Sequence, residues 1–247
     1  MTNAYIDGDM VVYRVGFTTE DVDHEIASAR AYDYINEILT KTNATAYKVF
    51  LTTPEDPTAF RYAAYPEYKA NRHSPRPKWY RELRDYLEVE FEAEVVKYLE
   101  ADDAMAIHQV ADLAQGIDSV ICTNDKDLKQ IPGMHYDPTK EKFETISPFE
   151  GLRRFYVQLL MGDSSDNVKG IYKVGIKTAT DMLSGCKTVQ QLFDVVRDAY
   201  GNDEEMLMNG RVLWIWRTDD DDWQRHFESL RTQAEKRSAG SHTLGDE

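Results

Sequence analysis

The sequence predicts an α/β protein with a mostly parallel sheet, followed by a helical C-terminal region. Up to about residue 147, short apolar runs typical of strands alternate with longer segments of helical periodicity. After that point the strand pattern stops and the sequence reads as helical. The chain has 247 residues, of which 42% are hydrophobic, so it can bury one large core and a smaller one.

The predicted elements follow one another in a regular order. Strands are expected at residues 3–7, 47–52, 93–98 and 119–123. Helices are expected at 76–91, from residue 100 onward, and at 24–42, where the core positions are Ile26, Ala29, Tyr34, Ile38 and Leu39. These elements predict an α/β part over 1–147, a helical part over 148–237 and a disordered tail over 238–247.

The composition excludes several classes of protein. No apolar run reaches membrane-spanning length and the N-terminus has no signal-peptide pattern, so we expect a cytoplasmic protein with no membrane partner. The two cysteines, Cys122 and Cys186, lack the paired spacing of a zinc site and argue against a disulfide framework. The net charge of −15 argues against a nucleic-acid partner, unless the negative charge is segregated from a basic surface.

Acidic residues follow the predicted strands at the points where the strands end. Because the carboxyl ends of parallel strands share one edge of a sheet, these acids are expected to converge. A carboxylate-rich site made only of oxygen ligands suits Mg²⁺ or Mn²⁺ better than Zn²⁺. The acids are Asp7 after the first strand, Glu55 and Asp56 after the second, Glu100, Asp102 and Asp103 after the third, and Asp125 and Asp127 after the fourth.

The helix that follows the third strand carries a stripe of apolar residues at helical spacing. The stripe consists of Ala104, Ile107, Ala111 and Ala114. Extended backwards, it includes Asp103 and Glu100, which are therefore predicted to face the core. A helix N-terminus stabilises each charge by only about 0.3–1 kcal/mol, so the cluster requires protonation or a bound cation. Taken singly, each acid also has an ordinary explanation as a turn or helix cap, and the GDSSDN segment at 162–167 as a polar loop.

A basic and aromatic stretch covers residues 60–84. Seven Lys and Arg residues oppose two Glu residues there, and five Tyr and Trp residues lie between them. Base stacking combined with phosphate contacts is the physical basis of single-strand binding. The alternative is a solvated helical face on which the aromatic residues serve packing. Since this stretch is separate in sequence from the acids, the net charge does not exclude a phosphate-binding surface.

A third motif, NVKGIYKVGIKTATDML, begins at residue 167. Gly170 and Gly175 flank a short turn before a predicted helix, and such a turn directs backbone N–H groups toward a phosphate. Lys169, Lys173 and Lys177 add positive charge. A nucleotide-binding P-loop is excluded, because Gly and Lys are not adjacent and the upstream four-residue spacer is absent.

Five motifs occur in a fixed order: IDGDMVVYR, FR followed by YKANR, EADDAMA, TNDKDLKQI and GDSSDNVKGIYKVGIKTA. Together they resemble the 5′-nuclease superfamily, which includes phage and bacterial flap endonucleases, 5′–3′ exonucleases and the 5′-nuclease domain of bacterial DNA polymerase I. The resemblance covers roughly residues 3–185. It implies a PIN-like α/β nuclease core with a helical arch at about 60–84 and a helix–three-turn–helix element for duplex DNA at 169–185.

The resemblance also implies the site residues. Two divalent cations, Mg²⁺ or Mn²⁺, would be held by Asp7, Glu100, Asp102, Asp103, Asp125, Asp127, Asp163 and Asp166. Lys69 and Arg72 would be catalytic, and DNA would contact Arg61, Tyr68, Lys69, Arg72, Gly170, Lys173, Gly175 and Lys177, with K⁺ as a further ion at the last loop. Pro54 stands where the family usually has a metal ligand, which Glu55 or Asp56 would replace or which is lost, and Asp9 stands at a usually uncharged position.

The function implied by the resemblance is that of a monomeric, metal-dependent, structure-selective 5′ nuclease. It would hydrolyse DNA at 5′ ends, flaps or nicks by a two-metal mechanism, in replication or repair in a bacterial or phage-infected cell. One alternative is a 5′ nuclease that acts like RNase H and removes RNA from RNA/DNA hybrids. Another is a catalytically inactive DNA-binding module, which eight acids would disfavour because without metal they would repel DNA.

Overall fold

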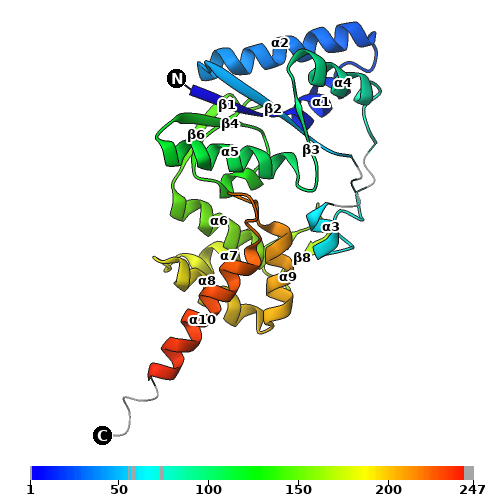
Figure 1. The fold of residues 1–247 in the computed structure, drawn as a ribbon. Coiled ribbons are helices and arrows are strands. Elements are labelled where there is room, and N and C mark those ends of the chain that lie inside the picture. The colour runs from blue at the N-terminus through cyan, green and yellow to red at the C-terminus, as the bar shows by residue number, and fades with distance from the viewer. Residues whose placement is uncertain (1, 55, 57–58, 73–74, 242–247) are drawn as a thin grey trace, which may run out of the picture. The chain divides into compact units, whose positions relative to one another are not determined.

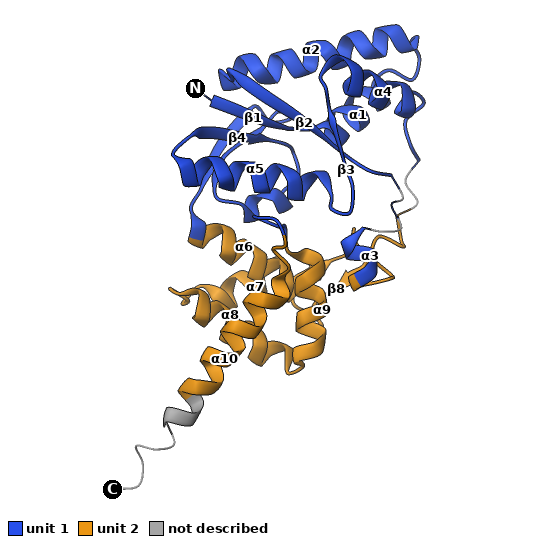
Figure 2. Ribbon diagram, in the orientation of Figure 1, with its two compact units in different colours: residues 1–63, 73–148, 215–219 blue, residues 64–72, 149–214, 220–247 orange. Residues whose placement is uncertain are grey.

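The computed structural model describes residues 2–54, 56, 59–72 and 75–241 and divides into two compact units. Unit 1 comprises residues 1–63, 73–148 and 215–219, and unit 2 comprises residues 64–72, 149–214 and 220–247 (Figure 2). The predicted arch region at 60–84 is therefore shared between the units, because residues 64–72 belong to unit 2. No helix among the described residues is long and apolar enough to cross a membrane.

Unit 1 contains a six-stranded sheet of order β3-β2-β1-β4-β5-β6. Five strands run parallel, and β6 pairs antiparallel with β5. The mostly parallel sheet predicted from the alternating pattern is confirmed, but β5 and β6, whose sequences mix charged and aromatic residues, were missed. The strands are β1 (Thr2–Asp7), β2 (Ala46–Thr52), β3 (Glu94–Val96), β4 (Asp118–Cys122), β5 (Gly133–Asp137) and β6 (Lys142–Ile146).

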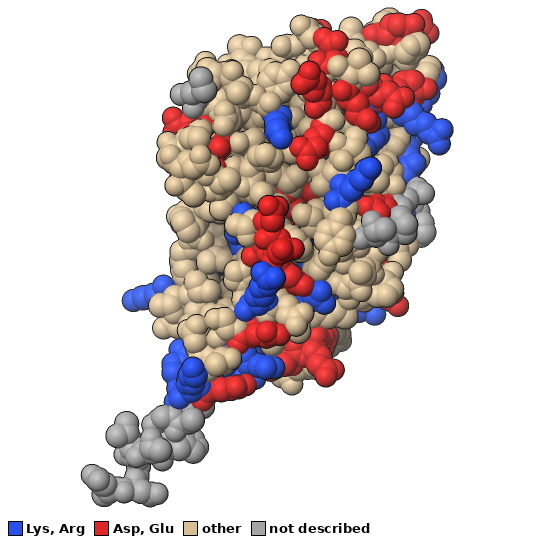
Figure 3. All heavy atoms as spheres, in the orientation of Figure 1, with Lys and Arg blue, Asp and Glu red and all other residues tan. Residues whose placement is uncertain are grey.

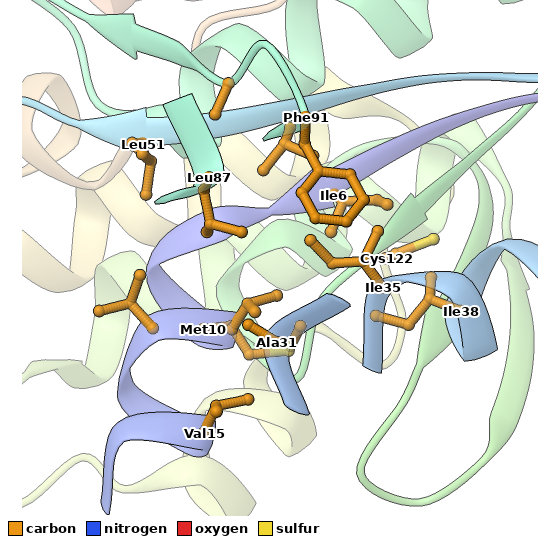
Figure 4. Close-up of a cluster of buried hydrophobic side chains, with 14 of the residues drawn as sticks. Ile6, Met10, Val15, Ala31, Ile35, Ile38, Leu51, Leu87, Phe91 and Cys122 are labelled. Carbon is orange, nitrogen blue, oxygen red and sulfur yellow. The ribbon is translucent and has the colours of Figure 1, made fainter. Parts of the chain in front are cut away.

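Helices cover both faces of this sheet (Figure 1). One face packs against α1 (Gly8–Phe17), α2 (His24–Thr42) and α4 (Tyr80–Glu90), and the other against α5 (Ala101–Gln115). Figure 4 shows the first core, where Ile6 of β1 and Leu51 of β2 lie among side chains from the three helices. The remaining helices of the first 148 residues are α3 (Phe60–Ala64) and the short 3₁₀ turn η1 (Asp127–Gln130).

Two helices differ from their predictions. Helix α2 has the predicted bounds, but its buried face runs through Ala27, Ala31, Ile35 and Ile38, whereas Ile26 is 46% exposed. The predicted face is confirmed at Ile38, which is buried, and at Tyr34 and Leu39, which pack partly buried against the core, but it is wrong at Ile26 and Ala29, which meet solvent. Helix α4 begins at Tyr80 instead of residue 76. Prolines at 75 and 77 explain the later start, since the residue before a proline avoids helical geometry.

Unit 2 is helical apart from a two-stranded hairpin. Its core is aromatic: Phe155 packs edge-on against Trp214, and Phe193 packs against Phe227. Helix α10 extends to Ser241, so the tail predicted to be disordered from residue 238 begins inside a helix, and 242–247 lie outside the described residues. The elements are α6 (Pro148–Met161), β7 (Gly162–Asp163), β8 (Val168–Lys169), α7 (Ile176–Leu183), α8 (Val189–Tyr200), α9 (Asp203–Leu213) and α10 (Trp223–Ser241).

Candidate metal centre and nucleic-acid-binding residues

Asp7 lies at the topological switch point of the sheet. From β1 the chain proceeds to β2 and β3 on one side, and it then returns to β4 on the other side of β1. Asp7 ends β1 and Thr123 follows β4, and the Thr123 hydroxyl donates a hydrogen bond to Asp7 at 2.7 Å. In open parallel sheets, ligands bind at the carboxyl edge at this point. Thr123 thus joins Asp7 to the start of the loop that carries Asp125, although the larger predicted cluster of acids does not form among the described residues.

Local packing holds Asp7 in place. Its carboxylate caps α1 by accepting the Met10 N–H at 2.9 Å. The next residue, Gly8, lets the first turn of α1 lie directly on β2, because a Cβ at this position would be 2.6 Å from the Phe50 carbonyl oxygen. Asp7 is consequently only 7% exposed. A buried carboxylate on a rigid turn is a well-ordered potential ligand.

The charge of Asp7 is poorly compensated. Burial, followed by repulsion from Asp9, raises the pKa of Asp7 to about 7, and Asp125 adds a smaller repulsion. Among the described residues, the Asp7 carboxylate accepts hydrogen bonds from two neutral donors, the Met10 N–H and the Thr123 hydroxyl. A divalent cation at this position would supply the missing positive charge.

The loop after β4 presents Asp125 and Asp127. The Asp125 N–H donates to the Thr123 hydroxyl at 3.0 Å, so one threonine orders both Asp7 and the start of this loop. The Asp125 carboxylate is exposed and accepts the Asp127 N–H at 2.8 Å. Asp127 is half-buried at the start of η1. The loop therefore carries one exposed carboxylate beside the buried Asp7.

Asp103 is fully engaged in a structural ion pair with Arg61. The two Arg61 nitrogens donate to its two oxygens at 2.5 and 2.8 Å, and Arg61 and Asp103 are 4% and 0% exposed. The Asp103 carboxylate also accepts the backbone N–H groups of Glu100 and Trp216 at 3.0 and 2.9 Å. Four donors leave no lone pair directed toward a metal. Because both side chains are buried and paired, this geometry disfavours two roles that the resemblance implied: Asp103 as a metal ligand and Arg61 as a DNA contact.

The core-facing side of α5 differs from the predicted one. Its buried residues include Ala101, Met105, Ala106 and Gln109, whereas Ala111 and Ala114 are exposed. The predicted stripe is therefore wrong at Ala111 and Ala114, whereas Ala104 packs against the core and Asp103 is buried, as predicted. Glu100 and Asp102 are half-buried at the start of the helix, and Glu100 lies 3.8 Å from Arg61.

In unit 2, Asp163 organises its own loop. It is 4% exposed, and one carboxylate oxygen accepts the Ser165 N–H at 2.8 Å and the Asp166 N–H at 3.3 Å, while the other accepts Gln158 at 3.2 Å. Such a pattern is typical of an aspartate that closes a turn onto its own backbone. As with Asp103, these contacts compete with the metal-ligand role that the resemblance implied.

The YKANR segment packs against the loop that carries Asp166. The Arg72 guanidinium pairs with the Asp166 carboxylate, which also accepts the Tyr68 hydroxyl at 3.1 Å. The Lys69 N–H donates to the Asp166 carbonyl at 3.0 Å, and Asn71 donates to Ser164 at 2.7 Å. Two motifs nearly a hundred residues apart thus form one structural element within unit 2.

This packing revises the expected role of Tyr68. Its side chain is only 2% exposed, so the Tyr68 ring cannot make the implied contact with DNA in this structure. Tyr68 instead holds Asp166 and lies beneath the Lys69 ammonium, which is 4.7 Å from the centre of its ring. Lys69 has a positive φ of 57°, a backbone geometry that the surrounding hydrogen bonds enforce.

The predicted duplex-binding loop is exposed. Lys173, Gly175 and Lys177 all face solvent in unit 2. Gly175 precedes α7 and a Cβ there would meet nothing within 4 Å. Gly170 has a structural role, because a Cβ there would lie 2.2 Å from the backbone of Met161 and Gly162 across the hairpin. The loop can therefore accept a phosphate at Gly175, whereas Gly170 allows the hairpin to close.

The two departures from the family pattern have different outcomes. Glu55 lies outside the described residues, and Asp56 accepts the Tyr98 N–H at 3.0 Å. The second departure, Asp9, forms an ion pair with Arg84 at 2.7 Å and accepts the Thr52 N–H at 2.8 Å. Sequence spacing gave no signal for this pair, because its members lie 75 residues apart on different helices.

The described residues contain no group of three or more His, Cys, Asp or Glu side chains close enough together to hold a metal ion. The donor chemistry nonetheless fits a hard divalent cation at Asp7, because burial and the neighbouring Asp9 raise the pKa of this carboxyl group and Thr123 links it to the Asp125 loop. Asp163 and Asp166 belong to the other unit. The structure thus supports one buried carboxylate and its exposed neighbour as the centre of the candidate site.

The chain is similar in sequence to curated proteins named DNA polymerase I or 5′-3′ exonuclease. DNA polymerase I of Bacillus caldotenax is 28% identical over 218 residues, covering 79% of this chain and 25% of the relative. The chain therefore spans about a quarter of the length of that relative. The 5′-3′ exonuclease of Buchnera aphidicola subsp. Schizaphis graminum is 25% identical over 206 residues, covering 76% of this chain and 72% of the relative.

Solved structures share the fold. The T5 D15 protein crystallised with metal ions has a TM-score of 0.67 and 16% identity, covering 94% of this chain and 99% of the neighbour. A complex of T5 D15 flap endonuclease with DNA and metal ions has a TM-score of 0.68, covering 95% and 100%. Residues 3–149 match the family described as the 5′-3′ exonuclease, N-terminal resolvase-like domain. That match covers more than half of the sequence, and the chain belongs to this family.

Proposed function

We propose that this protein is a metal-dependent 5′ nuclease that hydrolyses phosphodiester bonds of DNA at 5′ ends, flaps or nicks. The observation that carries the proposal is the buried Asp7 beside the Asp125 loop, at the switch point of a parallel sheet, in a chain of the 5′-3′ exonuclease family. The fold neighbour crystallised with DNA and metal ions supports the substrate and cofactor classes.

We assign the divalent cations, Mg²⁺ or Mn²⁺, to a smaller set of carboxylates than the resemblance implied. When bound, such ions polarise the phosphate and lower the pKa of a coordinated water. Asp103 and Asp163 are assigned to positioning, because their oxygens accept hydrogen bonds from neighbouring groups. The carboxylates assigned to the ions are Asp7, Glu100, Asp102, Asp125 and Asp127 of unit 1, whereas Asp166 of unit 2 is assigned to holding Arg72 and Tyr68.

The chain's own residues have distinct roles in this proposal. Thr123 holds Asp7 and the Asp125 loop in one arrangement. Lys69 supplies positive charge to the scissile phosphate, while Arg72 is held by Asp166 and positions the segment that carries Lys69. Lys173 and Lys177 contact duplex phosphates beside Gly175, where K⁺ is a further candidate ligand.

The test is a cleavage assay on a 5′-labelled flap, a blunt duplex and the matching RNA/DNA hybrid. Cleavage of the DNA substrates with Mg²⁺ or Mn²⁺, and none with EDTA, is expected. Preferential cleavage of the hybrid would identify the RNase H-like alternative. Binding without cleavage under all metal conditions would identify an inactive DNA-binding module and overturn the proposal.

Lys69→Ala is expected to lower kcat on a 5′ flap by the order of 10²-fold, with KM little changed. The reason is that an electrostatic group acting on the developing charge of the transition state affects kcat and not ground-state binding. Single-turnover kinetics would measure the effect, with Lys187→Ala, at an exposed lysine of unit 2, as the control. A defect that appears only in KM would show that Lys69 is a general phosphate contact.

Gly175→Asp is expected to weaken duplex binding by about tenfold while leaving the fold intact. The space around Gly175 is open and its backbone is extended, so the new carboxylate would meet an incoming phosphate and not the protein. Fluorescence anisotropy on duplex and single-stranded DNA would measure affinity, with Gly175→Ala as the control. Equal losses on both substrates would show that the loop is not specific for duplex DNA.

A further inference from the structure

Unit 1 has a surface groove that the candidate metal centre does not include. Helices α2 and α4 pack against each other, and the groove between them has a volume of about 600 Å³. Its walls come from the first two turns of α2 and from residues 82–89 of α4, and every side chain that lines it is exposed or half-buried. The α2–α4 groove, as we call it, is thus open to solvent along both helices.

Part of the α2–α4 groove is apolar and aromatic. Val89 is 82% exposed, although valine is usually buried. Beside it, the half-buried Tyr86 packs edge-on against Phe91, with ring centres 6.3 Å apart. Tyr32 packs against the same Phe91 at 5.7 Å and remains 44% exposed. Exposed tyrosines beside an aliphatic side chain are typical of surfaces that bind another protein.

The rim of the α2–α4 groove is acidic. Glu25 of α2 and Glu82 of α4 lie on its two sides, and no Lys or Arg is present among its described lining residues. The Glu25 carboxylate lies 3.2 Å from the His24 ring, which matches its charge only when the imidazole is protonated. Asp85 also lines the groove, but it adjoins the arginines on the other side of α4 and shares its charge with them. In Figure 3, Asp and Glu side chains gather over α2 and α4, at the top of the view.

The charge of the α2–α4 groove determines which ligand it can accept. Burial chiefly raises the pKa of Tyr86, and the exposed Glu90 and Asp33 raise it further, which places two more carboxylates beside the groove. A nucleic-acid phosphate would be repelled by these acids, so the groove is separate from any DNA-binding surface. Two copies of this chain joined groove to groove would also bring like charges together. A positively charged partner of another kind is therefore the best-matched ligand.

We propose that the α2–α4 groove binds a partner protein through a basic amphipathic helix. A third helix laid along two packed helices fits the shape of the groove. Its apolar side would cover Val89 and Tyr86, while Lys or Arg residues on its flanks would pair with Glu25 and Glu82. The walls extend over about two turns of each helix, which corresponds to partner anchor residues at positions i, i+3 or i+4, and i+7. This inference does not depend on the proposed nuclease function.

The test measures binding of a fluorescent peptide of about four helical turns, made of Leu and Lys, whose leucines recur at helical spacing. One control peptide has the same composition in scrambled order, and the other has Glu in place of Lys. By fluorescence anisotropy, the wild type is expected to bind the Leu/Lys helix at least about tenfold more tightly than either control peptide. The variant Glu82→Lys/Val89→Ser, changed at two exposed positions of α4, is expected to lose this preference.

The matched control is Met134→Ser/Asp198→Lys, which removes one exposed apolar side chain and reverses one exposed negative charge outside the groove. Because its net charge equals that of the groove variant, it should bind the peptide as the wild type does only if the groove itself is the site. Equal affinity of the wild type for all three peptides, or unchanged binding by the groove variant, would overturn the proposal. Sedimentation velocity tests the remaining occupant: dimerisation of the wild type that the groove variant abolishes would assign the groove to a second copy of this chain and overturn the proposed partner.

Discussion

Asp7→Asn is expected to abolish cleavage of a 5′ flap and, without metal, to stabilise the protein above neutral pH. Burial and Asp9 raise the pKa of Asp7 to about 7 in the folded state, from an ordinary value of 3.8. At a pH between these two pKa values, Asp7 is deprotonated in the unfolded chain but still protonated in the folded protein. The free energy of unfolding of the wild type therefore falls as the pH rises through this range. Asparagine carries no charge, so this loss, of the order of 2–4 kcal/mol, should disappear.

Metal addition gives the same prediction an independent readout. A cation that binds Asp7 stabilises the folded state, so Mg²⁺ should raise the unfolding temperature of the wild type more than that of Asp7→Asn. Thermal unfolding at pH 5 and pH 8, with EDTA or Mg²⁺, measures both effects. Asp118→Asn, an exposed aspartate at the opposite end of β4, is the control. Near-wild-type cleavage by Asp7→Asn at saturating Mg²⁺ would remove Asp7 from the metal centre.

Arg61→Met is expected to lower the free energy of unfolding by about 3–5 kcal/mol, because it leaves Asp103 charged and unpaired in a buried site. Replacing both partners, as in Arg61→Met/Asp103→Leu, should recover part of this loss, although the backbone N–H groups of Glu100 and Trp216 would lose their acceptor. Urea unfolding measures the change.

The control for this prediction is Arg225→Met, an exposed arginine whose replacement should change stability by no more than about 0.5 kcal/mol. The outcome also decides between two roles for Arg61. A small loss of stability together with a large loss of DNA affinity would show that Arg61 contacts DNA, as the resemblance implied. A large stability loss would confirm that Arg61 and Asp103 form a structural pair.

The sequence alone determined the principal architecture of unit 1. Alternation of apolar strand runs with helical segments predicts the first four strands and the bounds of α2, because local periodicity determines which backbone can bury its apolar side. The sequence also predicted that Asp7 and Asp125 lie just after the ends of strands. Parallel strands bring their carboxyl ends to one edge, so position along the chain is enough to predict that these two acids converge.

Only the tertiary structure determined which charged side chains are engaged in ion pairs and which are available to bind a metal ion or substrate. Asp103 forms an ion pair with Arg61, 42 residues away, and Asp9 forms one with Arg84, 75 residues away. No local sequence pattern predicts such pairings. The same is true of Arg72 and Asp166, whose motifs each resemble catalytic elements but bind one another within unit 2. A motif specifies which charges are present, whereas their partners depend on packing between distant segments, because a buried charge is stable only where the fold brings an opposite charge to it.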